Sequence, residues 1–119
     1  MPNSPKVLIV EDEHLIALDM KQTLVSNGYE VVEIANEPDT ALAYLAVEKP
    51  DVALLDLNLG DGHTSFEVAL RLKELGCPFV FVSGYSRSTF DLPENLADTP
   101  WIAKPFREKQ LLCELEQFA

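Results

Sequence analysis

The stretch LIVEDE, from Leu8 to Glu13, runs from three apolar residues directly into three consecutive acids. The apolar part has the composition of a buried β-strand. Negative charges packed together at the end of such a strand repel one another unless a positive group lies beside them. The stretch therefore predicts a strand that ends in a cluster of acids, and a cation that neutralises the cluster.

Apolar runs alternate with longer helical patterns along the whole chain. Five runs have strand character, namely 6–10, 30–35, 51–56, 78–83 and 101–103. Three of them are apolar at nearly every position, which is typical of parallel strands covered on both faces, whereas 30–35 is more polar and is expected at an edge. Helical patterns occupy 14–26, 40–48, 65–75 and 107–118. The alternation predicts a doubly wound α/β fold with a parallel sheet.

The segment 84–100 should hold the helix between the last two strands, but it contains two prolines and no long apolar stripe. We expect this fourth helix to be degenerate, either a short helix near 93–97 or a mobile loop. No repeat, low-complexity segment or linker interrupts the chain. Residues 1–119 therefore predict a single domain.

The composition excludes several classes of function. Twenty acids against nine bases give a formal charge of −11, which argues against direct binding to nucleic acid. No apolar run approaches the ~20 residues that span a membrane. The absence of a secretory leader favours the cytoplasm, and Cys77 and Cys113 are expected to be reduced thiols, because their spacing fits neither a metal site nor a redox motif.

Polar side chains follow four of the predicted strands where each strand ends. Glu11 and Asp12 follow the first strand, Asp56 ends the third, Ser83 ends the fourth and Lys104 ends the fifth. In an open parallel sheet the functional crevice lies beyond the carboxyl ends of the strands. We therefore expect three carboxylates, a hydroxyl and an ammonium to converge at one edge of the sheet.

This set of side chains suits phosphoryl chemistry. Lys104 offsets one negative charge, and Mg²⁺ would offset the rest through oxygen ligands. A carboxylate such as Asp56, beside a cation and a lysine, can attack phosphorus and form an aspartyl phosphate, with the Ser83 hydroxyl donating to a phosphoryl oxygen. Gly84 leaves room for a bulky donor. The alternative is that Glu11 and Asp12 cap the helix that begins near His14, which explains one acid but not Asp56 and Lys104.

With these residues in place, the chain resembles a response regulator receiver domain over essentially its whole length. The resemblance rests on VEDE after the first strand, LLDLN around Asp56, SGY after the fourth strand and KPF after the fifth. It implies a flavodoxin-like sheet of strand order 2-1-3-4-5. It also implies a cis peptide bond between Lys104 and Pro105.

The resemblance also implies a function. Asp56 would accept a phosphoryl group from the phosphohistidine of a histidine kinase or a histidine phosphotransfer protein, and a downstream protein target would read the change. Glu11, Asp12, Asp56 and the backbone carbonyl of Asn58 would hold Mg²⁺. Such a domain catalyses its own phosphorylation and dephosphorylation but is not an enzyme acting on other substrates.

The chain departs from the family pattern at three places that matter. Gly60 stands where proline is common, Ser83 replaces the commoner threonine, and Trp101 replaces the tyrosine or phenylalanine that usually switches. The stretch FVFVSGYS resembles a subfamily with a Phe-x-Thr-Gly-Tyr-like motif, whose members often pair with kinases of the HWE type. Tyr85 is then either a third switch residue, beside Ser83 and Trp101, or an ordinary surface aromatic.

Other functions remain as alternatives. A haloacid-dehalogenase-like aspartyl-phosphate phosphatase needs a second acid two residues after the nucleophile, where this chain has Asn58. A receiver-like interaction module that is never phosphorylated would not need all five polar side chains. A flavin- or dinucleotide-binding domain is disfavoured by the spacing of the glycines in LGDG. His63 in that loop is expected to be solvent-exposed rather than a ligand. The sequence leaves open whether the domain acts alone or within a longer chain.

Overall fold

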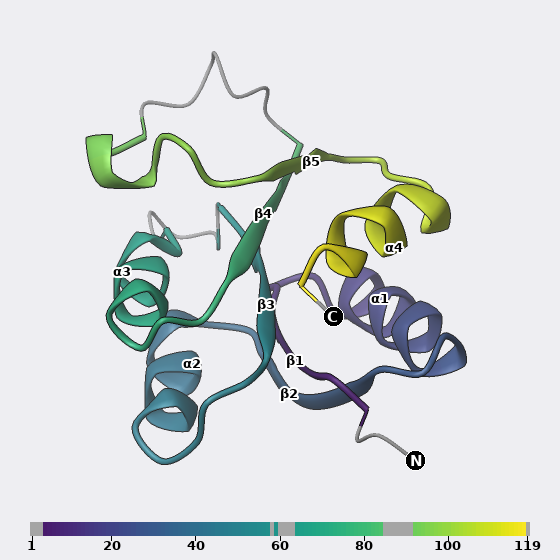
Figure 1. Cartoon of the computed structure of the whole chain (residues 1–119), viewed down its shortest axis with the longest axis horizontal. Helices are drawn as coiled ribbons and strands as arrows, with labels where there is room; N and C mark the ends of the chain where they lie inside the picture. The colour runs from purple at the N-terminus through teal and green to yellow at the C-terminus, as the bar shows by residue number, and fades with distance from the viewer. Residues whose placement is uncertain (1–3, 58, 60–63, 85–91, 119) are drawn as a thin grey trace.

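The computed structural model describes residues 4–57, 59, 64–84 and 92–118. Its centre is a five-stranded sheet of order β2-β1-β3-β4-β5, in which every neighbouring pair is parallel (Figure 1). The strands are β1 Lys6–Val10, β2 Glu30–Ala35, β3 Val52–Asp56, β4 Phe79–Ser83 and β5 Trp101–Ala103. The predicted fold class, strand order and edge position of 30–35 are confirmed.

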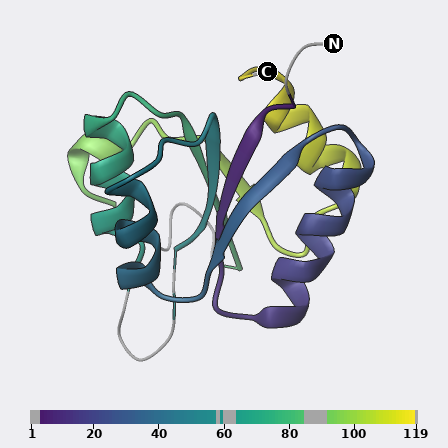
Figure 2. The same cartoon turned by 90° about the horizontal axis from the view of Figure 1, so that it is seen from below.

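Helices cover both faces of the sheet, as the view from below makes plain (Figure 2). The helices are α1 His14–Ser26, α2 Pro38–Leu45, α3 Phe66–Glu74 and α4 Glu108–Glu116, with a short 3-10 helix η1 at Glu94–Leu96. One face carries α1 and α4, and the other carries α2 and α3 (Figures 1 and 2). No helix in the described ranges is long and apolar enough to cross a membrane.

The hydrophobic core is divided into two layers by the sheet. In β1, Leu8 and Val10 pack into the layer under α2 and α3, whereas Val7 and Ile9 pack into the layer under α1 and α4. The alternation follows from the pleat, because successive side chains of a strand point to opposite faces. Continuous apolar runs are therefore needed in the central strands, and β1, β3 and β4 are buried along almost their full length.

α1 has the predicted limits, whereas the ends of α2, α3 and α4 differ from the predicted ones by a few residues. α2 begins at Pro38, before the expected start at 40, because proline suits the first helical turn, where its missing N–H costs no hydrogen bond. α3 and α4 are shorter than their apolar patterns. Gly28 and Gly76, with φ of +91° and +71°, follow α1 and α3 and adopt the left-handed conformation that ends a helix. In the described part of 84–100, the degenerate fourth helix is the single turn η1, within the predicted range 93–97.

Candidate functional site

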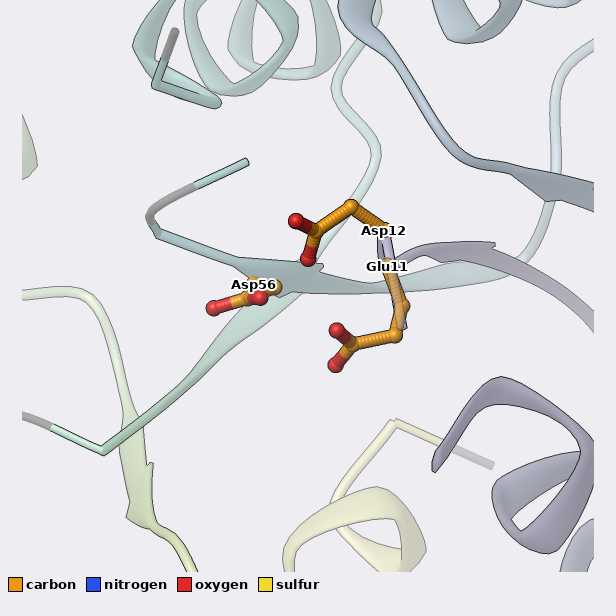
Figure 3. Close-up of side chains that lie close together, drawn as sticks. All are labelled: Glu11, Asp12 and Asp56. Atoms are coloured by element: carbon orange, nitrogen blue, oxygen red, sulfur yellow. The ribbon is translucent and has the colours of Figure 1, made fainter. Parts of the chain in front are cut away.

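The acids of the predicted cluster meet at the carboxyl edge of the sheet. Glu11 and Asp12 directly follow β1, and Asp56 is the last residue of β3, which pairs with β1. Figure 3 shows their carboxylates gathered around one space at this edge. One carboxylate oxygen from each of the three residues lies within 4.8 Å of those from the other two. The predicted convergence of these acids is confirmed.

Lys104, the residue that follows β5, joins the cluster. Its ammonium nitrogen lies 2.8 Å from Oε1 of Glu11 and 3.3 Å from Oδ2 of Asp56. The exposed fractions of the three side chains are 16% for Lys104, 0% for Glu11 and 9% for Asp56. Because buried charges lose their hydration, one ammonium shared between two carboxylates is the least compensation that this arrangement needs.

The backbone orients Lys104 toward the acids. Its N–H donates to the carbonyl of Ser83 at 2.8 Å, which continues the β4–β5 pairing past the end of β5. The Lys104–Pro105 peptide bond is cis, as predicted. From its place after β5, the Lys104 side chain extends past the end of β4 to Asp56 of β3 and to Glu11, which follows β1.

The cluster holds more negative charge than Lys104 neutralises. Burial, helped by the neighbouring charge of Glu11, raises the pKa of Asp56 to about 7, although Lys104 opposes the shift. Burial alone would lower the pKa of Lys104, but its hydrogen bond to Glu11 and the charges of Asp56 and Glu11 outweigh burial and raise it. Near neutral pH, Asp56 is therefore divided between its protonated and charged forms, and a further cation would favour the charged form.

The alternative that these acids cap α1 accounts for only part of the geometry. The N-cap residue is Glu13, which makes no side-chain capping hydrogen bond. Oε2 of Glu11 accepts the backbone N–H of Glu13 at 3.1 Å, so Glu11 does assist the start of the helix. Asp12 is exposed and has no hydrogen bond or ion pair within the described residues. Capping therefore does not explain Asp12, Asp56 or Lys104.

The remaining predicted site residues are divided between described and undescribed parts of the chain. Ser83 is buried at the end of β4, at the same edge as Asp56, and a Cβ added to Gly84 would meet no atom within 4 Å. Trp101 is half-buried and packs edge-on against Phe81, with 6.1 Å between ring centroids. The remaining predicted positions lie outside the described residues: Asn58, Gly60, His63 and Tyr85.

Two features of the structure were not predicted from the sequence. The first is that Glu11, among the acids expected near Lys104, is nearer to its ammonium than Asp56 is, at 2.8 Å against 3.3 Å. The second is an apolar stripe on the outer side of α1, made by Leu15, Leu18 and Val25, which are 81%, 43% and 53% exposed. The sequence did contain a sign of this stripe: Leu15, Leu18 and Val25 are spaced by three and seven residues, which places them on one side of a helix, away from the buried Met20 and Leu24.

A hollow of about 530 Å³ lies between α3, η1 and the end of α4, at the opposite end of β4 from the acid cluster. None of the site residues lines it.

Known proteins resemble this chain over nearly its whole length. The family described as response regulator receiver domain matches residues 7–116. The sensory transduction protein LytT of Bacillus anthracis is 35% identical over 95% of this chain and 46% of its own length. The phyllosphere-induced regulator PhyR of Methylorubrum extorquens is 30% identical over 94% of this chain and 42% of its own length. The chain thus spans about half the length of such curated relatives.

Solved structures agree with these sequence matches. The receiver domain of PhyR from Erythrobacter litoralis has a TM-score of 0.83 and 31% identity, over 98% of this chain and 90% of that one. SdrG from Sphingomonas melonis has a TM-score of 0.83 and 33% identity, over 99% of this chain and 98% of that one. With the matching fold, strand order and acid cluster, these similarities show that the chain belongs to the response regulator receiver domains of two-component systems.

Proposed function

We propose that this receiver domain is a phosphoacceptor, in which Asp56 takes a phosphoryl group from a phosphohistidine with the help of Mg²⁺ and the resulting conformational change carries the signal. The observation that supports this most directly is the placing of Asp56. It is almost buried, 3.3 Å from the Lys104 ammonium, and within reach of two further carboxylates at a sheet edge. A purely structural carboxylate would not need this surplus of negative charge.

The reaction follows from the chemistry of these groups. A carboxylate oxygen of Asp56 forms a bond to phosphorus while the bond from phosphorus to the donor's imidazole nitrogen breaks, and the electron pair leaves with that nitrogen. Lys104 stabilises the charge on the phosphoryl oxygens, and the Ser83 hydroxyl, at the same edge of the sheet, donates a hydrogen bond to one of them. Attack of water on the phosphorus of the same site reverses the modification. The domain thus acts on itself and not on a separate substrate.

The acid cluster fits a magnesium ion. Its donors are hard carboxylate oxygens, and the raised pKa of Asp56 indicates that the cluster lacks positive charge. Glu11, Asp12 and Asp56, with the backbone carbonyl of Asn58, would place the ion. When bound, Mg²⁺ supplies the charge neutralisation that lets a phosphoryl group approach an anionic nucleophile.

The partners follow from the family and from α1. Receiver domains interact with histidine kinases and with downstream targets. Leu15 lies in the first turn of α1, beside the acid cluster, and is the most exposed large apolar side chain of the described residues. A donor protein that brings a phosphohistidine to Asp56 would cover this turn. The donor is either a histidine kinase, for which the HWE type is a candidate, or a histidine phosphotransfer protein.

Residues 1–119 act as one receiver domain in the cytoplasm, a location that suits the free thiols of Cys77 and Cys113. The signal passes from Ser83 toward Trp101, with Tyr85 as a further switch residue. The downstream protein target binds the surface that this movement changes.

The experiment is intact-mass measurement after incubation with acetyl phosphate and millimolar Mg²⁺. We expect one phosphoryl adduct on the wild type and none on Asp56→Asn. Asp98→Asn, which removes an exposed acid near η1, is the matched control and should be labelled like the wild type. Equal labelling of Asp56→Asn would rule out the assignment. A wild type that takes no phosphoryl group from acetyl phosphate or from any kinase would favour an interaction module instead.

A further inference from the structure

Glu11 makes contacts in two directions at once. One carboxylate oxygen, Oε1, accepts a hydrogen bond from the Lys104 ammonium at 2.8 Å. The other, Oε2, accepts the backbone N–H of Glu13 at 3.1 Å. The side chain has no exposed surface, so water cannot replace either donor cheaply. Both oxygens of this acid are therefore held within the protein.

These contacts form a continuous chain from the phosphoacceptor to a helix. Asp56 contacts Lys104 at 3.3 Å, Lys104 contacts Glu11, and Glu11 contacts the N-cap residue Glu13. The carbonyl of Glu13 then accepts the N–H of Ala17 at 3.0 Å, which is the first hydrogen bond of α1. A rigid chain of charged and hydrogen-bonded groups is the kind of network through which one site can bias another.

Asp12 differs from Glu11 although the two are adjacent. Its side chain is exposed, and no hydrogen bond or ion pair involves it in the described part of the chain. It is free to contact a cation from solvent, whereas both oxygens of Glu11 already accept hydrogen bonds within the protein. Besides its place in the acid cluster, Glu11 therefore has contacts within the protein that Asp12 lacks.

We infer that Glu11 is a positioning residue that holds Lys104 beside Asp56 and transmits a change at Asp56 to the first turn of α1. The regulatory part of this inference rests on the proposed function. A phosphoryl group on Asp56 attracts Lys104, the contact between Lys104 and Glu11 weakens, and Glu11 no longer holds the N–H of Glu13 in the same place. The first turn of α1, which carries Leu15, then reports the state of Asp56 to a bound donor protein.

Amide hydrogen exchange in the metal-free protein tests the connection without phosphorylation. In Lys104→Met, the amides of Glu13 and Ala17 should exchange about fivefold faster, the factor that corresponds to the loss of one hydrogen bond. Glu11→Gln should have the same effect, and the double variant should add nothing further, because both changes break one chain of contacts. Lys104→Arg, which keeps the charge and the donors, should restore slow exchange.

Two controls separate this effect from general destabilisation. Asp12 lies in the same loop as Glu11 but takes no part in the chain of contacts. Asp12→Asn should therefore leave the rate of amide hydrogen exchange at Ala17 unchanged. The amides of α2, which is remote from Lys104, should exchange at the wild-type rate in every variant. If Glu11 served α1 only as a local cap, Lys104→Met would leave α1 unchanged, and that result would overturn the inference, as would fully additive effects of the two substitutions.

A second arm adds Mg²⁺ and beryllofluoride, a phosphoryl mimic, to the wild type. Exchange at Glu13 and Ala17 should rise toward the rate of Lys104→Met, and Asp56→Asn should show no change. Fluorine NMR shows whether beryllofluoride binds. If it binds and the exchange rates in α1 do not change, the transmission from Asp56 to α1 is overturned, but the role of Glu11 in positioning Lys104 is not. A failure of beryllofluoride to bind would count against the proposed function, while the metal-free variants would still decide the role of Glu11.

Discussion

At the scale of single residues, burial and the neighbouring charge of Glu11 disfavour the charged form of Asp56. The pKa of this carboxyl is about 7, well above its ordinary value of 3.8, mainly because it is buried and lies beside Glu11. Each unit of such a difference corresponds to about 1.4 kcal/mol between the two protonation states. The folded domain therefore binds a proton at Asp56 more tightly than the unfolded chain does, and it can exchange that proton for a metal ion or a phosphoryl group.

The first prediction follows from the sign of this shift. Because the folded-state pKa exceeds the unfolded one, the stabilisation from protonated Asp56 is present below about pH 4 and is lost as pH rises through about 7. The raised pKa of Lys104 affects stability only in the alkaline range and does not contribute in this window. Metal-free wild type should therefore lose stability between about pH 5 and pH 8.

The metal-free Asp56→Asn variant should lose less stability than the wild type between about pH 5 and pH 8, because an amide side chain cannot ionise. Thermal unfolding of both proteins in a chelating buffer at the two pH values measures the difference. Asp98→Asn serves as the control and should follow the wild type. Parallel pH profiles for wild type and Asp56→Asn would contradict the electrostatic account of the cluster.

The second prediction concerns Asp12 and the metal. Removing this acid with Asp12→Ala should raise the Tm of the metal-free domain, because one source of like-charge repulsion disappears. Millimolar Mg²⁺ should raise the Tm of the wild type, since a ligand that binds only the folded state stabilises it, and should raise that of Asp12→Ala much less. Calorimetry with and without Mg²⁺ gives both quantities. Asp39→Ala, an exposed acid on α2, should keep the full response to Mg²⁺.

At the scale of elements, α1 serves two surfaces. Its inner side buries Ala17, Met20 and Leu24 in the core, while its outer side exposes Leu15 and Leu18. Exposed apolar side chains that share one side of a helix are typical of a surface that a partner covers. The position of the first turn beside the acids makes this the side from which a donor would reach Asp56.

The third prediction separates donor binding from chemistry. Leu15→Ala should slow phosphoryl transfer from a cognate kinase about tenfold, as expected for an anchor residue near the centre of an interface. Labelling by acetyl phosphate, which needs no protein contact, should be unchanged, and so should the Tm, because Leu15 is 81% exposed. Val47→Ala, which truncates another residue of similar exposure, is the control. Equal loss with both donors would place the effect in the site itself.

At the scale of the whole molecule, stability comes from two apolar layers that share one sheet. Most of the large buried side chains come from β1, β3, β4 and the four α-helices, and η1 and β5 add Leu96 and Ile102. Each fully buried aliphatic side chain stabilises the fold by about 1.5–3 kcal/mol. The surplus acids at the carboxyl edge are tolerated because this stability lies elsewhere, in the body of the sheet and its helices.

The fourth prediction compares two leucines of α3. Leu72 is fully buried under the sheet, and Leu72→Ala should reduce the free energy of unfolding by about 2–5 kcal/mol. Leu70 is 37% exposed, and Leu70→Ala should cost less than about 1.5 kcal/mol. Urea unfolding of both variants measures the difference, and since both substitutions affect helix propensity equally, that difference reports burial. Similar losses would indicate that the outer side of α3 is also covered.

The sequence by itself determined the order of the elements, the edge position of β2 and the meeting of Glu11, Asp12 and Asp56. The reason is local: apolar periodicity follows the pleat and the helical turn, and parallel strands must bring their carboxyl ends to one edge. β3 is apolar up to its last residue, Asp56, and this places the Asp56 carboxylate at the carboxyl edge of the sheet.

Only the tertiary structure decided how the charges are shared. The ammonium of Lys104 lies nearer to Glu11 than to Asp56, and Glu11 also holds the start of α1. The limits of α2 and the exposed side of α1 likewise depended on neighbouring elements. Such features depend on distances of a few tenths of an ångström between residues far apart in the chain, and on burial that sets the strength of each charge interaction. No pattern of residue types carries that information, because it arises only when the packed elements exclude water from the site.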